Sequence, residues 1–306
     1  MNQLIHPFSA RLKQFRAFLR AHTWARIACM FLLLFFALSI LLHPHGTKTF
    51  LLLGMDNYGS LDESGRSDVT MLVQVDFTRA KISAVTFARD MFVENENGKL
   101  TKINTIVRNH DEQTLCETIE RNFGVPIDGW FRVNFTSVIE LVDAIGGAQV
   151  ELTKAEANYI NKTAGRYPQH PLGEGVCRLN GAQALTYARC RKLDNDLGRG
   201  ERQSKLLSAM VDQTRHMTAA NVAAVFSSLK HAWRSSLSIG EQTSLVFKAL
   251  WLRGADVERF SMPFEGHFRY GSAGSASGLV TDIEENRRLL LESLGRPYAA
   301  PTDAEQ

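Results

Sequence analysis

Residues 49–87 read TFLLLGMDNYGSLDESGRSDVTMLVQVDFTRAKISAVTF. This stretch holds three apolar runs, at 49–53, 70–77 and 81–87, which are separated by segments rich in Gly, Ser and Asp. The first run is continuously apolar until Gly54, and the second alternates apolar with polar side chains. Both patterns are typical of β-strands, so three strands are predicted here, with charged residues where they end.

The rest of the chain alternates helical and extended patterns. Residues 111–123 place Leu115, Ile119 and Phe123 at four-residue intervals, which is one face of a helix, and Gly124 ends it. The other expected elements are strands at 130–135, 148–152 and near 257–262, a helix with a Ser137–Glu140 capping box, a loop at 158–175, and helices at 180–209 with an interruption at 194–200, between 221 and 251, and at 282–294. Strands interleaved with helices predict one α/β domain.

The N-terminal region combines a basic tail with an apolar run. The chain of 306 residues is 44% apolar and 22% charged, as expected for a folded protein with a core. Its net charge is +3, but residues 1–26 hold five basic residues and no acidic one, which leaves −2 for the remainder. This distribution excludes a chain-wide basic surface for nucleic acid.

Residues 27–43 are predicted to form a single transmembrane helix. The run from Ile27 to Leu42 contains no charge, Gly or Pro and spans about 24 Å as a helix. By the positive-inside rule, residues 1–26 are a cytoplasmic tail and the following domain is extracytoplasmic. The alternative is a cleaved signal peptide, for which the small residues inside the run make a poor cleavage site.

Two carboxylates flank the first two predicted strands. Gly54-Met55-Asp56 ends the first strand, and Gly65-Arg66-Ser67-Asp68 precedes the second. Loops that flank adjacent strands meet at one sheet edge, where α/β folds build sites. Mg²⁺ is usually held by one or two carboxylates together with phosphate oxygens, so this pair is a candidate metal site. The alternative interpretation is an ordinary Asp-rich turn.

Arginines gather in two further places. Arg89-Asp90 follows the third predicted strand, either as part of a site or as a surface ion pair. A denser set comprises Arg189, Arg191, Asp194, Asp196, Arg199, Arg202 and Gln203. Guanidinium groups grip phosphate oxygens in pairs, so this segment is either a pyrophosphate site or a solvated basic helix end. Because Arg189 and Arg191 are two residues apart, the helix must end near them if both are to face one ligand.

Seven blocks of sequence stand in the order LLLGMD, GRSD, ARD, KIN, VDAIGG, LNGAQALTYARCR and GRGERQ. With these blocks the chain resembles the LytR-CpsA-Psr (LCP) family over essentially all of its exported part. The resemblance implies one LCP-like α/β domain at 48–296, with a central mixed β-sheet flanked by helices and a C-terminal tail at 297–306. The family usually has Pro before Arg-Asp, and Ala88 stands there instead, which is expected to loosen the backbone.

The resemblance implies a magnesium-dependent (or manganese-dependent) phosphotransferase of the cell membrane. Such an enzyme transfers a phosphoglycosyl polymer from a polyprenyl-pyrophosphate carrier to a peptidoglycan hydroxyl, with the lipid tail in an apolar groove. We expect this groove to be lined by the strands and by the helices at 111–123 and 138–145. The partners implied are the lipid-linked glycopolymer, the peptidoglycan acceptor and membrane lipid, with no nucleic acid.

Site residues are carried over by position. Asp56 and Asp68 match the metal carboxylates, whereas Lys102 and Asn104 match a block expected to support a loop. The residues that match or are assigned to pyrophosphate binding are Arg66, Arg89, Arg189, Arg191, Arg202 and Gln203. The expected catalytic residues are Arg66, Arg89, Asp90 and Asp196, with Asp90 or Asp196 as the base that accepts the hydroxyl proton.

Two other functions fit the same residues. The first is hydrolysis of the lipid pyrophosphate by water, and the second is an envelope regulator that binds lipid phosphate without turnover. The polymer, the acceptor hydroxyl and the oligomeric state do not follow from the sequence. Cys116, Cys177 and Cys190 lie outside the apolar run and permit one disulfide.

Overall fold

The computed structural model describes residues 45–62, 67–163, 171–190, 192–193, 196–249, 252 and 254–298. The chain divides into two compact units, Met1–His45 and Gly46–Gln306, and the fold described below is that of the second. The predicted cytoplasmic tail and transmembrane helix, and the C-terminal tail beyond residue 298, lie outside the described residues. Within the described part, no helix is both long and apolar enough to cross a bilayer.

A six-stranded mixed sheet forms the centre of the domain. Its strands, in spatial order, are β10 (Asp256–Met262), β3 (Lys81–Phe87), β2 (Ser67–Asp76), β1 (Thr47–Met55), β6 (Gly129–Val133) and β9 (Arg234–Ser235). β1 pairs antiparallel with β2 and parallel with β6, and β3 pairs parallel with β10. The three strands predicted from residues 49–87 are therefore adjacent in the sheet, and the predicted mixed α/β architecture is confirmed.

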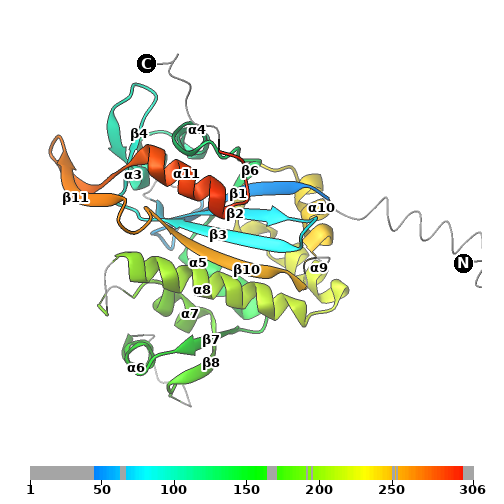
Figure 1. Cartoon of the computed structure of the whole chain (residues 1–306). Helices are drawn as coiled ribbons and strands as arrows, with labels where there is room; N and C mark the ends of the chain where they lie inside the picture. The colour runs from blue at the N-terminus through cyan, green and yellow to red at the C-terminus, as the bar shows by residue number, and fades with distance from the viewer. Residues whose placement is uncertain are drawn as a thin grey trace, which may run out of the picture. The chain divides into compact units, whose positions relative to one another are not determined.

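Alternate side chains of β1 face two different layers. Leu51, Leu53 and Met55 are buried in the main core together with α3 (Ile103–Asn109), α4 (Glu112–Phe123) and α11 (Ile283–Ser293). Leu52 and Gly54 face the other layer, which contains α5 (Phe135–Ala144), α7 (Gly181–Ala188) and α8 (Asp196–Arg215). Figure 1 shows α4 and α11 on one side of the sheet and α8 on the other. The period-two pattern of a strand produces this division.

The helix predicted at 111–123 forms as expected. The carboxylate of Asp111 accepts the backbone N–H of Thr114 at 2.7 Å, which caps α4 at its N-terminus. Gly124 ends the helix in the left-handed conformation at φ 68°, which glycine adopts without strain. The predicted face of Leu115, Ile119 and Phe123 is fully buried in the main core.

Smaller elements surround the central sheet. β7 (Ala148–Leu152) and β8 (Gly175–Leu179) form a two-stranded antiparallel sheet that packs with α6 (Lys154–Thr163), α7 and α8. The remaining described elements are the pair β4 (Phe92–Glu94) and β5 (Leu100–Lys102), the hairpin β11 (Phe268–Ala273) and β12 (Ala276–Thr281), the helices α9 (Ala219–Ser228) and α10 (Ile239–Ala249), and the 3₁₀ turn η1 (Lys230–Ala232).

Three predicted boundaries are wrong. The interruption expected at 194–200 does not extend to 200, because α8 already begins at Asp196. The first part of the loop expected at 158–175, residues 158–163, belongs to α6, because Ala157 and Ile160 pack in one core with β7 and β8 and hold this polar segment as a helix. The capping box expected at Ser137–Glu140 is formed instead by Asn134, whose side chain accepts the Ser137 N–H at 2.9 Å while the Ser137 hydroxyl accepts the Asn134 N–H at 3.2 Å. The helix therefore begins at Phe135, and the strand before it ends at Val133.

The disulfide that the sequence permits does not form among the described cysteines. Cys116, Cys177 and Cys190 are all free thiols. Cys116 lies in the main core, and Cys190 is buried next to the C-terminus of α7.

Candidate active site

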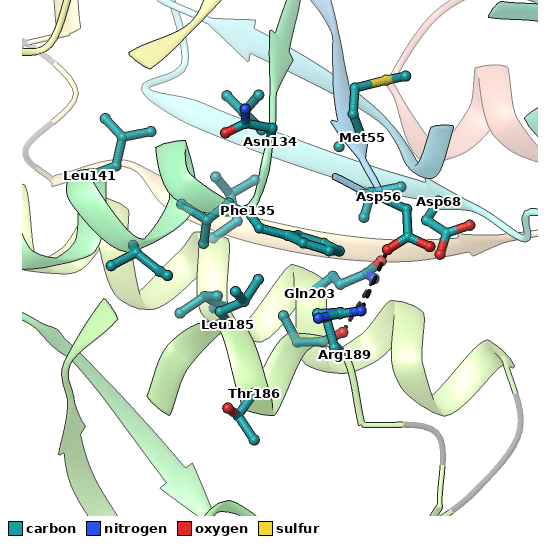
Figure 2. A pocket seen from close by; sticks show the side chains of 18 of the residues that line it. Met55, Asp56, Asp68, Asn134, Phe135, Leu141, Leu185, Thr186, Arg189 and Gln203 are labelled. Atoms are coloured by element: carbon teal, nitrogen blue, oxygen red, sulfur yellow. Dashed lines mark hydrogen bonds and ion pairs between the residues drawn. The ribbon is translucent and has the colours of Figure 1, made fainter. Parts of the chain in front are cut away.

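A cavity of about 750 Å³ lies between the central sheet and helices α5, α7 and α8. Most of its wall is apolar, from residues that include Leu52, Met71, Val138, Leu141, Leu185, Leu206, Leu207 and Met210. Polar residues gather at one end, and Figure 2 shows Asp56, Asp68, Arg189 and Gln203 together there, away from Leu141. The groove expected from the sequence thus has α5 in its wall as predicted, whereas α4 packs in the core on the opposite face of the sheet.

Two carboxylates enter this polar end from adjacent strands. Asp56 follows β1, and Asp68 lies in β2 beside an irregularity of register at Gly54 and Met55. A side chain at position 54 would place its Cβ 2.9 Å from the Cβ of Val69, so glycine allows the two strands to approach here. Asp56 is about half exposed, at 46%, whereas Asp68 is 18% exposed. Two carboxylates at one site fit the requirement of Mg²⁺, which takes its other ligands from phosphate or water.

Arg189 reaches the same end of the cavity from the C-terminus of α7. The helix ends at Ala188, so the side chain of the following residue turns toward the two strands. Its Nη2 lies 3.4 Å from Asp56 Oδ1, and its Nη1 donates to the hydroxyl of Tyr58 at 3.4 Å. The guanidinium carbon lies 3.9 Å from the ring centroid of Phe135, which is cation–π geometry. The expectation that the helix ends near Arg189 is met, and Arg191 lies outside the described residues.

Arg89 and Asp90 do not line the cavity but lie next to Asp68, which does. Arg89 Nη1 lies 3.5 Å from Asp68 Oδ1, and its Nε lies 3.7 Å from Asp90 Oδ2. Asp90 also pairs with Lys102 at 3.4 Å. Of these charged groups only Asp68 lines the cavity, so Arg89 and Asp90 meet the site through that carboxylate.

Backbone hydrogen bonds hold the loop that carries Arg89. The N–H of Asn104 donates to the carbonyl of Arg89 at 3.4 Å, which is the loop support expected of this block. The N–H of Ala88 donates to the carbonyl of Met262 at 2.7 Å. A proline has no N–H and would lose this bond, so Ala88 ties the end of β3 to β10 where the sequence predicted a looser backbone.

Helix α8 contributes three polar residues of different kinds. Arg199 and Gln203, one turn apart, both line the cavity, and Arg199 is 4% exposed. Arg202 lies between them on another face, where its Nη2 donates to the carbonyl of Cys190 at 2.7 Å and its Nη1 lies 3.7 Å from Glu156. The structure therefore brings Gln203 to the cavity and leaves Arg202 in a buried contact outside it.

The sequence placed Arg199 in the arginine-rich segment but assigned it no role in the site. The signal that identifies it is helical spacing, because residues 199, 203, 206, 207 and 210 form one stripe of α8 along the cavity. Tyr58 and Phe135 were also missed, since only folding brings the Tyr58 hydroxyl and the Phe135 ring to Arg189. Of the other expected residues, Arg66 and the side chain of Asp196 lie outside the described part.

The chain is similar in sequence to proteins of one known family. A profile of the LytR_cpsA_psr family matches residues 36–282. The polyisoprenyl-teichoic acid–peptidoglycan teichoic acid transferase TagV of Bacillus subtilis (strain 168) is 30% identical over 182 residues, which cover 57% of this chain and 45% of that protein. The chain therefore matches about half the length of this relative.

Solved structures share the fold. The structure described as TagT bound to LIIa-WTA superposes with a TM-score of 0.67 at 24% identity, over 81% of this chain and 91% of that one. The LytR-CPS2A-psr family protein YwtF (TagT) with bound octaprenyl pyrophosphate lipid gives a TM-score of 0.62 at 22% identity, over 81% and 90%. Likeness at this level of identity shows a common fold.

Proposed function

Because the chain belongs to the LytR_cpsA_psr family, we propose that it transfers a phosphate-linked glycopolymer from a polyprenyl-pyrophosphate carrier to a hydroxyl of the peptidoglycan glycan. The relative TagV is named for the same kind of transfer, and the related TagT structure holds octaprenyl pyrophosphate. The proposal applies that chemistry to this chain.

One observation carries the proposal, namely that a single cavity is apolar along its length and charged at one end. A ligand complementary to such a cavity has a long apolar part that ends in an anionic group. Burial of apolar chain contributes about 0.8 kcal/mol per CH₂ group, so the apolar wall supplies affinity for a lipid tail. The guanidinium of Arg189 at the charged end supplies donors for phosphate oxygens.

Asp56 and Asp68 are the residues that we propose for the divalent cation. They come from adjacent strands, line the same end of the cavity and have oxygen donors of the kind that Mg²⁺ prefers. A bound Mg²⁺ ion supplies charge neutralisation for the pyrophosphate oxygens. Arg89, which contacts both Asp68 and Asp90, orients the Asp68 carboxylate from behind.

The transfer breaks the bond between the bridging oxygen and the polymer-side phosphorus and forms a new bond from that phosphorus to the acceptor oxygen. Polyprenyl phosphate leaves, and Arg189 and Arg199 are positioned to stabilise charge on the phosphates. The acceptor hydroxyl's proton goes to a base. Because Asp90 pairs with Arg89 and Lys102 away from the cavity, we assign Asp90 to positioning and propose Asp196 as the base.

We propose that the protein acts in the cell membrane, on the outer side. The apolar run at 27–43 would anchor it beside its lipid substrate, with the basic residues of 1–26 in the cytoplasm. Fusion of a reporter enzyme after residue 306 tests this topology, since a periplasm-type reporter is active only when exported. Activity of a cytoplasmic-type reporter at the same place overturns it.

Purified full-length chain in detergent, given Mg²⁺, a polyprenyl-pyrophosphate glycan and soluble peptidoglycan chains, tests the reaction. The expected products are a glycan–phosphate–peptidoglycan diester and polyprenyl phosphate. Arg189→Ala is expected to reduce transfer, whereas Arg288→Ala, which removes an exposed ion-paired arginine of α11, is the matched control. Release of free phosphorylated polymer would establish hydrolysis instead, and bound lipid without turnover would establish a binding protein.

A further inference from the structure

A second pocket, of about 430 Å³, adjoins the apolar cavity at Tyr58 and Asn134. We call it the second pocket and define it by the loop from Tyr58 to Asp62, the N-terminal part of α5 and the segment from His231 to Arg234. Its volume falls within the range of about 300–1,000 Å³ that is usual for small-ligand sites. Apart from Tyr58 and Asn134, its lining residues are different from those of the cavity described above.

The lining of the second pocket combines aromatic rings with paired polar groups. His231 Nε2 lies 3.2 Å from Glu140 Oε2, and Arg234 Nη1 lies 2.7 Å from Asp62 Oδ1. These pairs are substantially exposed and contribute little to stability, so their donors and acceptors are available to a ligand. Hydroxyl groups act as both donor and acceptor, which matches a wall that offers both.

Trp233 is fixed so that it offers ring surface rather than its N–H. Its Nε1 donates to Gln242 Oε1 at 2.9 Å, and its ring packs against Phe226 with centroids 5.5 Å apart. Tyr58 is 62% exposed, which is high for so large a side chain. The negative faces of aromatic rings attract the weakly positive C–H groups of sugar rings, so the second pocket has the mixed surface that a glycan requires.

The second pocket and the lipid cavity share a wall. Tyr58 and Asn134 line both, and α5 separates the rest. Val138 and Leu141 face the cavity, whereas Thr136 and Glu140, one helical turn apart, face the second pocket. The wall is anchored, because Asn134 Nδ2 donates to the carbonyl of Gly59 at 2.7 Å.

Tyr58 also connects the two sites directly. Its hydroxyl accepts from Arg189 at 3.4 Å, and its ring meets Phe135 edge to face at 4.9 Å. A glycan in the second pocket therefore lies beside the arginine proposed for the phosphate. We propose that the second pocket binds sugar rings of the glycan acceptor and presents a hydroxyl to the polymer-side phosphorus, an inference that rests on the proposed transfer.

The geometry of in-line displacement is a reason to assign the second pocket to the acceptor glycan and not to the sugars of the donor. The attacking and leaving oxygens stand on opposite sides of the phosphorus. The leaving polyprenyl phosphate occupies the cavity on one side of α5, so the attacking hydroxyl comes from the side that the cavity does not occupy. The second pocket is a candidate for that side, because it lies across α5 from the cavity and shares Tyr58 and Asn134 with it. The acceptor oxygen then gains the phosphorus, its proton passes to the base, and the bridging oxygen leaves with the lipid phosphate.

Two-substrate kinetics on the full-length chain test the proposal. Glu140→Gln and Arg234→Ala are expected to raise the KM for soluble peptidoglycan chains at least about fivefold, while the KM for the lipid donor stays within about twofold. Glu258→Gln is the matched control, since this carboxylate is also half exposed and ion-paired, at 2.8 Å from Lys81 on the far edge of the sheet. An unchanged acceptor KM overturns the inference and leaves the transfer reaction intact. A raised donor KM assigns the second pocket to the donor's sugars and also overturns it.

Glycan binding by itself is measured by tryptophan fluorescence. Trp233 is one of four tryptophans, so titration with soluble peptidoglycan chains is expected to change the emission of the wild-type chain. Trp233→Phe keeps an aromatic ring and is expected to abolish that change. If the emission changes but no transfer activity is found, glycan binding in the second pocket is supported and the proposed function is contradicted. No change at saturating glycan overturns the inference whatever the activity.

Discussion

The contact between Arg189 and the ring of Phe135 predicts a measurable coupling in donor binding. The guanidinium carbon lies 3.9 Å from the ring centroid, and the arginine side chain is 47% exposed. A cation–π contact at such an exposed site is worth about 0.5–1 kcal/mol. Phe135→Leu removes the ring and keeps an apolar side chain, so it is expected to weaken donor binding about two- to fivefold by releasing the guanidinium.

Arg189→Met is the second substitution of a double-mutant cycle with Phe135→Leu. Charge-assisted hydrogen bonds contribute about 1.5–3 kcal/mol, so loss of the guanidinium is expected to weaken donor binding about 10- to 150-fold. Phe135 also packs against Tyr58 and borders the cavity, and those contacts persist in both backgrounds. The double-mutant cycle removes their contribution and isolates the pair, with an expected coupling of about 0.5–1 kcal/mol.

Fluorescence anisotropy with a labelled polyprenyl pyrophosphate gives the four dissociation constants. The melting temperature of each variant is the control for folding, and the exposed Arg189–Asp56 pair at 3.4 Å is expected to contribute no more than about 1 kcal/mol to stability. Strict additivity of the two substitutions would refute the reasoning. So would a donor affinity that is unaffected by Arg189→Met, because the arginine would then not contact the phosphate.

Three further predictions concern stability and reactivity. Gly181→Ala is expected to destabilise the fold by about 1–3 kcal/mol in urea unfolding, because its Cβ would lie 2.3 Å from a backbone oxygen of α5, whereas Gly173→Ala meets nothing within 4 Å and is the control. Hydrogen bonds from the Thr114 N–H and hydroxyl lower the pKa of Asp111. The capping bond therefore stabilises α4 fully above the ordinary pKa of 3.8, and this stabilisation is lost as the pH falls through the lowered pKa. Asp111→Ala is expected to lower the free energy of unfolding by about 1 kcal/mol at pH 7 and by less at pH 3. Burial raises the pKa of Cys116 to about 12, so iodoacetamide is expected to modify Cys177 first, and mass spectrometry that finds Cys116 modified in the native protein contradicts this.

Patterns along the chain predict the sheet but not every boundary. The strands at 49–53, 70–77 and 81–87 were predictable because alternation and apolar runs reflect burial on the two faces of a sheet. The start of α5 was misplaced because Asn134 caps it, and a Ser-x-x-Glu pattern three residues later imitates the same signal. The strands β4, β5, β8, β9, β11 and β12 were not predicted. Of these, β9 has only two residues and pairs with β6, which lies far earlier in the chain, so no local pattern indicates it.

The candidate site was predicted in part for a similar reason. Asp56 and Asp68 follow from strand ends, which topology brings together. The second pocket has no such signal, because it is assembled from three segments between Tyr58 and Arg234 that carry no common motif. A role for the second pocket could be proposed only after the fold showed Tyr58 in contact with Arg189.

Burial separates arginines that look alike in the sequence. The pair of Arg189 with Asp56 is nearly half exposed on both sides, so it contributes at most about 1 kcal/mol and breaks easily. We therefore expect a phosphate, which would offer about 1.5–3 kcal/mol of charge-assisted hydrogen bonding, to displace the carboxylate and free it for the proposed cation. Arg202 is 3% exposed beside Glu156, and breaking a buried pair costs about 3–5 kcal/mol. On this reasoning the proposed ligand is expected to exchange the partners of Arg189, whereas Arg202 is expected to keep its partners and to hold α8 against the end of α7.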